Sequence, residues 1–376
     1  MSLKGLFLAS FLGLIAAGCS NEEVEEVLVA KSEQNAVGFN VLNSVSTSTR
    51  ATLINSSNLK KNKFAVWALT NDNTFFMGNA VTSGGTSNLG GVSIEYSTSK
   101  WAYSNADDIA YWPTTANPLN FYAVSPVNGT LNYTWNVESA NKTIEYTTND
   151  EYSDATINDN VDAMYAVKLN QISTSNNGTV KMQFRHILSN VAFKATTEYE
   201  SITVEIDSMK LHNVAMGGTF TIPTNENKPT RADNWAVGTK LDTLTLVKGT
   251  TFNVGHNDTT AITVDAPMLV VPQELTKWDV ATTSTKPTAK ADAAGQSYLE
   301  ISCKIKQNGV CLFGTDTKSE TLYVPFGADF QPGNRYTYTI CFGGGYDVNG
   351  DPILKPITFD ADVTDWDDIS GDIKNY

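Results

Sequence analysis

Histidine and cysteine are scarce in this sequence, whose 376 residues include three histidines and four cysteines. His186, His212 and His256 lie far apart, and no Cys/His cluster has the spacing of a zinc site. The sequence also lacks the G-x-S-x-G turn of many serine hydrolases, the P-loop and the G-x-G-x-x-G phosphate loop. We therefore expect a protein that is not an enzyme, with no catalytic residues, no metal and no cofactor. The histidines are expected to have structural or surface roles.

Basic residues are outnumbered by acidic ones. The chain has 26 Lys and Arg against 40 Asp and Glu, a formal net charge of −14 at neutral pH. An acidic chain of this kind repels phosphate backbones, so nucleic acid is not an expected partner.

Long hydrophobic runs are absent except at the N-terminus, where Leu6 to Ala17 follows Lys4. This run is too short to cross a hydrocarbon core of about 30 Å. A positive charge, an apolar run and small residues are typical of a secretory signal, which we place at residues 1–18. The segment Ala16-Ala17-Gly18-Cys19 resembles the bacterial lipobox, although position 16 is more usually Leu. We expect Cys19 to be lipidated, and residues 19–50 to form an N-terminal pro-segment.

An acidic patch follows the cysteine, in Ser20-Asn21-Glu22-Glu23 and then Glu25 and Glu26. It resembles the surface-export signal of Bacteroidetes lipoproteins. A solvated linker that holds the body away from the membrane is the alternative.

The remaining cysteines are Cys303, Cys311 and Cys341, an odd number that leaves at least one thiol outside any intramolecular disulfide. Cys303 and Cys311 flank Asn308-Gly309, so a hairpin there could bring them together. The alternative is that all three are small apolar residues of the core.

Segments with alternating apolar and polar residues, or rich in β-branched and aromatic residues, predict strands. Short strands separated by Gly-Gly and Asn-Gly pairs indicate β-sandwiches, with few short peripheral helices. The expected strands are 63–69, 119–124, 180–184, 191–196, 203–206, 241–247, 268–271, 298–305, 321–324, 335–342 and 357–363. The expected turns include Gly84-Gly85, Gly90-Gly91, Asn128-Gly129, Asn177-Gly178, Gly217-Gly218, Asn308-Gly309 and Asn349-Gly350.

The length allows two domains. We place them at 51–188 and 189–376, because the strands before and after Phe184-Arg185-His186 indicate two different cores. Residues 276–297 are rich in Thr, Ala, Ser and Lys and are expected to form a loop inserted in the second domain.

Two segments or residue sets could bind a ligand, calcium in one case and a glycan in the other, but each also has a purely structural interpretation. Asp347-Val348-Asn349-Gly350-Asp351 resembles the start of a calcium loop, but Pro352 stands where an EF-hand needs glycine, and an Asn-Gly hairpin explains the same residues. Seven tryptophans, among them Trp101, Trp112 and Trp366, could form a glycan platform, although core packing is their usual role in a sandwich.

Motifs spread over most of the chain, taken in order, resemble the fimbrillin family of Bacteroidetes, the type V pilins. They are Tyr111-Trp112-Pro113, Asn120 to Pro126, Asp162 to Ala166, Phe184 to Ser189, Gly217 to Phe220, Val270 to Gln273, Tyr323 to Pro325, Gln331 to Tyr336 and Val363 to Trp366. The resemblance implies two tandem transthyretin-like (Greek-key) β-sandwich domains.

The resemblance also implies assembly by proteolysis and strand exchange. An arginine-directed protease would cut between Arg50 and Ala51, in a loop rich in Ser and Thr, and remove the lipid together with a first strand that contains Phe39 and Val41. The emptied groove would then receive a strand from a neighbouring subunit.

The strand that is donated should come from the C-terminal end, with Phe359, Ala361 and Val363 as its apolar residues. A stalk subunit is the first hypothesis. Residues 369–376 form only a short tail beyond this strand, which counts against a donor role, so a tip or accessory subunit that keeps its lipid is the alternative.

The partners implied are other pilin subunits, the outer membrane through the lipid before processing, and a host protein or glycan receptor. The implied location is the outer membrane and cell surface, and the fimbria after processing.

Overall fold

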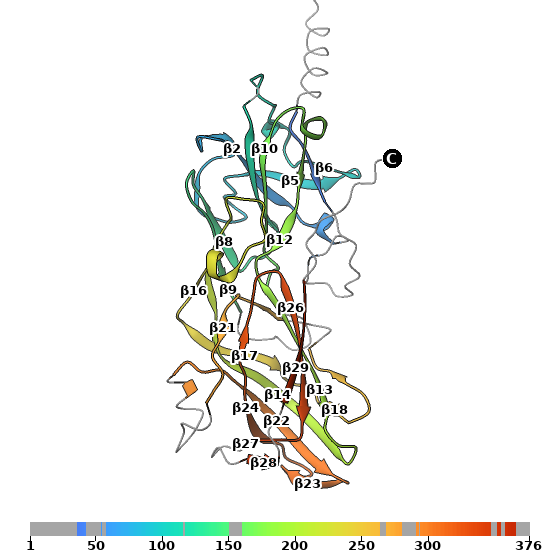
Figure 1. Cartoon of the computed structure of the whole chain (residues 1–376). Coiled ribbons are helices and arrows are strands. Elements are labelled where there is room, and N and C mark those ends of the chain that lie inside the picture. Colours follow the sequence, from blue (N-terminus) through green and yellow to red (C-terminus); the bar gives the residue numbers. More distant parts are fainter. Residues whose placement is uncertain are drawn as a thin grey trace, which may run out of the picture.

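A computed structural model describes residues 36–42, 54, 58–115, 117–149, 160–263, 268–279, 291–292, 294–346, 352–354 and 358–365. They form β-strands joined by turns and short helices, arranged as two β-sandwiches that lie end to end (Figure 1). The expected all-β fold is confirmed. The short helices described are η1 (Leu59–Lys61), η2 (Ala106–Asp108), η3 (Ser175–Gly178) and α2 (Arg231–Asn234).

The first sandwich has a central sheet and a second sheet. The central sheet has the order β12 (Phe184–His186), β10 (Met164–Gln171), β7 (Leu119–Ser125), β2 (Phe64–Thr70), β5 (Val92–Ser97) and β6 (Lys100–Tyr103), with β3 (Phe75–Met77) paired to β2. The second sheet has the order β16 (Trp235–Val237), β15 (Gly217–Thr221), β9 (Lys142–Thr147), β8 (Tyr133–Val137) and β4 (Val81–Gly84).

The second sandwich is built in the same way. One sheet has the order β19 (Thr260–Ala261), β13 (Ser189–Thr197), β26 (Asn334–Phe342) and β29 (Thr358–Asp365), with β20 (Met268–Val270) paired to β13. The other has β17 (Leu241–Val247), β14 (Ile202–Ala215), β22 (Tyr298–Gln307), β24 (Glu320–Pro325), β27 (Gly344–Tyr346) and β28 (Pro352–Leu354), with β18 (Phe252–Val254) on β14 and β23 (Val310–Phe313) on β22. A small ribbon pairs β21 (Glu274–Leu275) with β25 (Ala328–Asp329).

The central sheet of the first sandwich is buried on both faces. Side chains of β2 alternate between two cores, so that Trp67 packs toward the second sheet while Phe64 and Val66 pack on the opposite face. This explains why β2 is an almost unbroken apolar run, since a strand covered on both sides has no polar face. The opposite face is covered by β1 (Gly38–Val41) and β11 (Thr179–Met182), and side chains of β5 and β6 belong to the same core.

The chain passes between the sandwiches more than once. It first leaves the first sandwich near Leu188, since β12 ends at His186 and β13, in the second sandwich, begins at Ser189. It then returns, because β15 pairs with β9 of the first sandwich and β16 pairs with β15. The second domain is therefore not one continuous stretch from residue 189, and residues 217–237 belong to the first sandwich.

The expected turn at Gly217-Gly218 is wrong, because both glycines lie inside β15. A Cβ atom on Gly217 would come 2.7 Å from the Tyr146 carbonyl oxygen, and one on Gly218 would come 2.7 Å from that of Ala236. The glycines allow close approach of neighbouring backbones rather than a change of direction.

Cys303, Cys311 and Cys341 form no disulfide in the structure. The Asn308-Gly309 hairpin exists, but it pairs Cys311 with Lys306 and leaves Cys303 inside the core. Burial raises the pKa of the Cys303 thiol to about 12. Cys303 is thus a small core residue, whereas Cys311 and Cys341 are half-buried.

Candidate functional site

Strand β1 lies on the face of the central sheet that points away from the second sheet, and it has little backbone pairing. It runs parallel to β11, with Gly38 opposite Thr179 and Val41 opposite Met182. At its ends, the Val37 N–H donates to the Ala110 carbonyl at 2.8 Å and the Leu42 N–H to the Met182 carbonyl at 3.1 Å. A strand of four residues with one paired neighbour is held mainly by its side chains.

Two side chains of β1, and that of Val37 just before it, point into the core. Val37, Phe39 and Val41 are 0%, 6% and 3% exposed. The Phe39 ring meets the rings of Phe64 and Phe121 edge-on, each with centroids 6.1 Å apart. At about 1.5 to 3 kcal/mol for each buried side chain, removing the strand would leave an apolar surface that is expensive to hydrate. We call this surface the β1 groove and define it by Phe64, Tyr103, Phe121, Val180 and Met182.

One wall of the β1 groove is fixed by contacts that do not involve β1. The Trp112 indole N–H donates to the Gly178 carbonyl at 2.9 Å and so ties the start of β11 to the sheet. Trp112 also packs edge-on against Phe121, with centroids 5.8 Å apart. On the other wall, Tyr103 donates its hydroxyl to the Val37 carbonyl at 2.9 Å, and burial raises its pKa to about 12.

A buried hydrogen-bonded pair, Asp162 and His186, holds the chain just beyond the expected cleavage point. The Ile54 N–H donates to Asp162 Oδ2 at 2.7 Å, and His186 Nδ1 lies 2.8 Å from Asp162 Oδ1. Because a carboxylate only accepts hydrogen bonds, Nδ1 carries the hydrogen. The side chains of Asp162 and His186 are 0% and 1% exposed, and Ile54 is buried in the same core as Phe39. The chain is therefore anchored at Ile54 independently of β1.

Strand β29 contains the residues expected to be donated. It lies at the edge of its sheet, antiparallel to β26, with Phe359 opposite Ile340 and Val363 opposite Tyr336. Phe359 packs edge-on against Phe326 at 5.4 Å between centroids, but Ala361 is exposed and Val363 is 49% exposed. Its apolar residues are thus only partly used within this chain.

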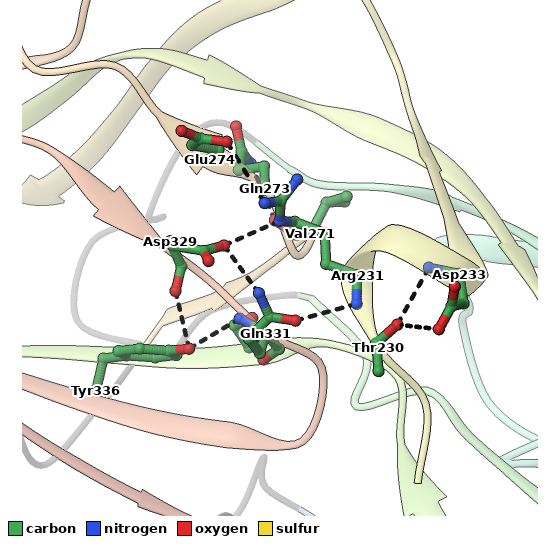
Figure 2. A network of polar contacts seen from close by, with 10 residues as sticks. Thr230, Arg231, Asp233, Val271, Gln273, Glu274, Asp329, Gln331 and Tyr336 are labelled. Atoms are coloured by element: carbon green, nitrogen blue, oxygen red, sulfur yellow. Dashed lines mark hydrogen bonds and ion pairs between the residues drawn. The ribbon is translucent and has the colours of Figure 1, made fainter. Parts of the chain in front are cut away.

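A polar network joins the two sandwiches (Figure 2). Arg231 of α2 donates through Nε to Asp329 Oδ1 at 2.9 Å and through its backbone N–H to Gln331 Oε1 at 3.1 Å. The Tyr336 hydroxyl accepts from the Gln331 N–H and donates to the Asp329 carbonyl. Since α2 lies between β15 and β16, this network fixes the returning segment against the second sandwich.

A second ionisable cluster lies on the second sandwich. His212 Nε2 is 2.9 Å from Glu300 Oε2, Lys210 Nζ is 3.0 Å from Oε1, and Thr243 Oγ1 is 3.0 Å from His212 Nδ1. The hydrogen bond from His212, with the charge of Lys210, lowers the pKa of Glu300 to about 2.

Acid should therefore weaken the fold through Glu300. A carboxylate whose folded pKa lies below its ordinary value of 4.5 contributes stability above that value, and this stability is lost as the pH falls toward 2. Between pH 5 and 2.5, the free energy of unfolding of the wild type, measured in urea, should fall by about 2 kcal/mol more than that of Glu300→Gln. This figure is reduced because the Glu300 side chain is partly exposed. Glu200→Gln, at an exposed position, serves as the control and should follow the wild type. Parallel curves for Glu300→Gln and the wild type would contradict the assignment.

The outer face of the second sheet of the first sandwich carries a cleft of about 830 Å³. Its lining includes Thr134, Glu145 and Thr147, and its one aromatic residue, Tyr133, is itself buried in the core. Of the tryptophans considered for a glycan platform, Trp101 and Trp112 are instead buried in the core beneath β1.

Several sequence expectations concern residues outside the described ones. These are Cys19, Arg50, Ala51, Trp366, residues 369–376 and the whole segment from Asp347 to Asp351. Within the part of the chain that the structure describes, no group of three or more His, Cys, Asp or Glu residues is arranged to hold a metal ion. Among the same residues, no helix has the length and apolar character needed to span a membrane.

Some residues of the site were not expected from the sequence. Asp162 and His186 appear in the family motifs, but no spacing indicates that they form a pair. Ile54 and Arg231 carry no signal at all, because their partners lie 108 and 98 to 100 positions away.

Comparison with known proteins identifies the family. Residues 49–366 match a family described as fimbrillin-like, and since this is most of the chain, the protein belongs to that family. It is a fimbrial or cell-adhesion subunit, not an enzyme, and belongs with the subunits of a cell-surface appendage. No curated protein matches the sequence.

One similar solved structure shares the fold. A fimbrial protein from Bacteroides vulgatus is similar over 89% of this chain and 100% of its own, with 16% identity and a TM-score of 0.58. The tip fimbrial protein Mfa3 from Porphyromonas gingivalis covers 81% of this chain and 94% of its own, with 10% identity and a TM-score of 0.36. At these identities the first likeness concerns the fold alone.

Proposed function

We propose that this protein is a stalk subunit of a type V pilus, exported as a lipoprotein through Cys19, cut after Arg50 and polymerised by donor-strand exchange. The observation that carries the proposal is β1 itself. It is a short strand, paired only with β11 among the described strands. Its two buried side chains and that of Val37, just before it, fill an apolar groove, one wall of which is fixed without them.

The position of Ile54 supports a cut upstream of it. The Asp162 contact would retain the new N-terminus while residues 19 to 50, including β1, leave together with the lipid. The emptied groove would expose the unpaired edge of β11 and apolar side chains, which another strand can cover by β-augmentation. The polymer would then be held at the cell surface by its neighbours rather than by the lipid.

A protease-swap experiment tests this function. An arginine-specific protease should trim the full-length chain to an N-terminus at Ala51 and yield SDS-resistant ladders, whereas Arg50→Ala and Arg50→Lys should stay monomeric. Arg50→Lys keeps the charge, and a lysine-specific protease should restore its trimming and its ladders. Ladders from uncut Arg50→Ala, or trimming after Arg50 without ladders, would overturn the stalk function.

A tip or accessory subunit is the second function. The observation that favours it is that β29 is paired along its whole length within its own chain, from Thr358 to Asp365. Such a subunit would keep Cys19 and bind a host protein or glycan. The N-terminal residue of the protein isolated from cells, lipidated Cys19 or Ala51, separates the two functions.

A further inference from the structure

We propose that Phe359 of one subunit occupies the place that Phe39 leaves in the next, in a strand that runs parallel to β11. This inference rests on the proposed function, because it needs β1 to be removed and β29 to be donated. It adds to that function the direction of the donated strand, its register against β11, and the residue that determines how it fits the β1 groove.

The direction comes from the strand that is replaced. β1 is parallel to β11 over Gly38–Val41, and its inward residues alternate at positions 37, 39 and 41. The groove therefore consists of three apolar positions in a fixed order, with the largest in the middle. A replacement that keeps both the backbone pairing and the filling must present a small or medium apolar residue, a large aromatic one and another apolar one, at every second residue.

The C-terminal region matches this order in a single place. Ile357-Thr358-Phe359-Asp360-Ala361 repeats the pattern of Val37-Gly38-Phe39-Asn40-Val41. From residue 352 to 376 no other aromatic residue has apolar neighbours two positions before and two after it, since Trp366 has Thr364 and Asp368 there.

Packing volume decides between the two registers that keep the apolar face inward. With Phe359 at position 39, Ala361 replaces Val41 and leaves a gap of two methyl groups. Shifted by two residues, Phe359 would be forced into the place of Val37, and Ala361 would leave most of the space between Phe64 and Phe121 empty. Cavities of the second size cost far more than those of the first, so the first register is favoured.

The present surroundings of β29 make it available. Its neighbour on one side is β26, its other edge has no partner among the described strands, and Ala361 and Val363 are exposed. Phe359 lies seventeen positions after Phe342, the last residue of β26, and this length can span at most about 60 Å when fully extended. The segment includes β27 and β28, which pair with β24 and with each other. Phe359 can therefore reach beyond its own sandwich once β27, β28 and β29 all leave their partners.

In the favoured register, the Asp360 carboxylate lies opposite Lys181 of the next subunit. Asn40 of β1 lies opposite Lys181 of β11, so Asp360 would take that position in the next subunit. A pair of opposite charges across neighbouring strands is favourable. The shifted register would place Asp362 there instead, and an antiparallel strand with Phe359 in the same pocket would place Thr358 there.

Cysteine crosslinking in the full-length, protease-trimmed protein distinguishes these arrangements. K181C is combined in turn with D360C, D362C or T358C, and ladders are analysed by non-reducing gels after boiling and by mass spectrometry of the linked peptides. Residues directly opposite each other on neighbouring strands meet the Cα separation that a disulfide needs. Each single-cysteine variant controls for bonds to Cys303, Cys311 and Cys341.

The expected result is a loss of monomer into a covalent ladder for K181C with D360C, but not for the other two pairs. Linkage through D362C or T358C, or ladders without any linkage to K181C, would overturn the inference while leaving strand exchange intact. If trimmed wild-type protein forms no ladder, the proposed function itself fails, and the inference with it. The substituted aspartates are exposed, so their loss does not disturb the core.

Discussion

Replacing Phe39 with alanine will lower the free energy of unfolding of the uncut chain by about 3 to 5 kcal/mol. The ring is almost fully buried, and the rings of Phe64, Tyr103 and Phe121 surround it, each with centroids about 6 Å away. Urea unfolding followed by tryptophan fluorescence measures the change, since Trp101 and Trp112 belong to the same core. Arg50→Ala should be present in every variant, so that all of them retain β1.

The neighbouring position supplies the control. Asn40 is exposed on the same strand, and Asn40→Ser should change the stability by less than about 0.5 kcal/mol. A Phe39→Ala protein as stable as Asn40→Ser would mean that β1 contributes little to the core. If Arg50 is left intact and cut, Phe39→Ala and the wild type should give identical polymers, because the altered residue is removed.

Replacing Asp162 with alanine will cost a similar amount, about 3 to 5 kcal/mol, because it leaves both His186 and the Ile54 N–H buried without their acceptor. His186→Ala should also destabilise the protein. The double variant should lose less than the sum of the two single losses, with a coupling of about 1 to 3 kcal/mol, since the two side chains act as one unit.

Asp108→Ala, at an exposed position of the same sandwich, is the matched control and should be near neutral. Additive losses in the double variant would show that Asp162 acts mainly through Ile54 rather than through His186. Proteolysis of the Asp162→Ala chain should also become faster near residue 54, because the segment loses its anchor.

Much of the fold follows from local pattern. Leu241 to Val247 is rich in apolar and β-branched residues and forms β17 with the same bounds, and the Asn308-Gly309 pair forms a hairpin between β22 and β23. Other strands extend beyond their pattern. The expected strand 203–206 is the beginning of β14, which continues to Ala215, because pairing with β22 on one side and β17 on the other sustains it.

The limits of the sequence are those of long-range contact. A Gly-Gly pair predicts a turn, and only the nearby Tyr146 and Ala236 carbonyls explain why Gly217-Gly218 is instead a strand. For the site, alternation identified Phe39 and Val41 as the inward face of a strand, and the structure places both in the core. The Asp162–His186 pair and the contacts of Arg231 could not be predicted, because they join residues brought together only by the finished sheets.

The return of the chain through β15 and β16 sets the order in which this protein can fold. The first sandwich lacks two strands of its second sheet, with Phe220 and Trp235 of its core, until residue 237 has been made or exported. The N-terminal strands of this sandwich must therefore stay partly uncovered while β13 and β14 of the other sandwich are synthesised. The first sandwich can be completed only after part of the second has been made, although the two have separate cores.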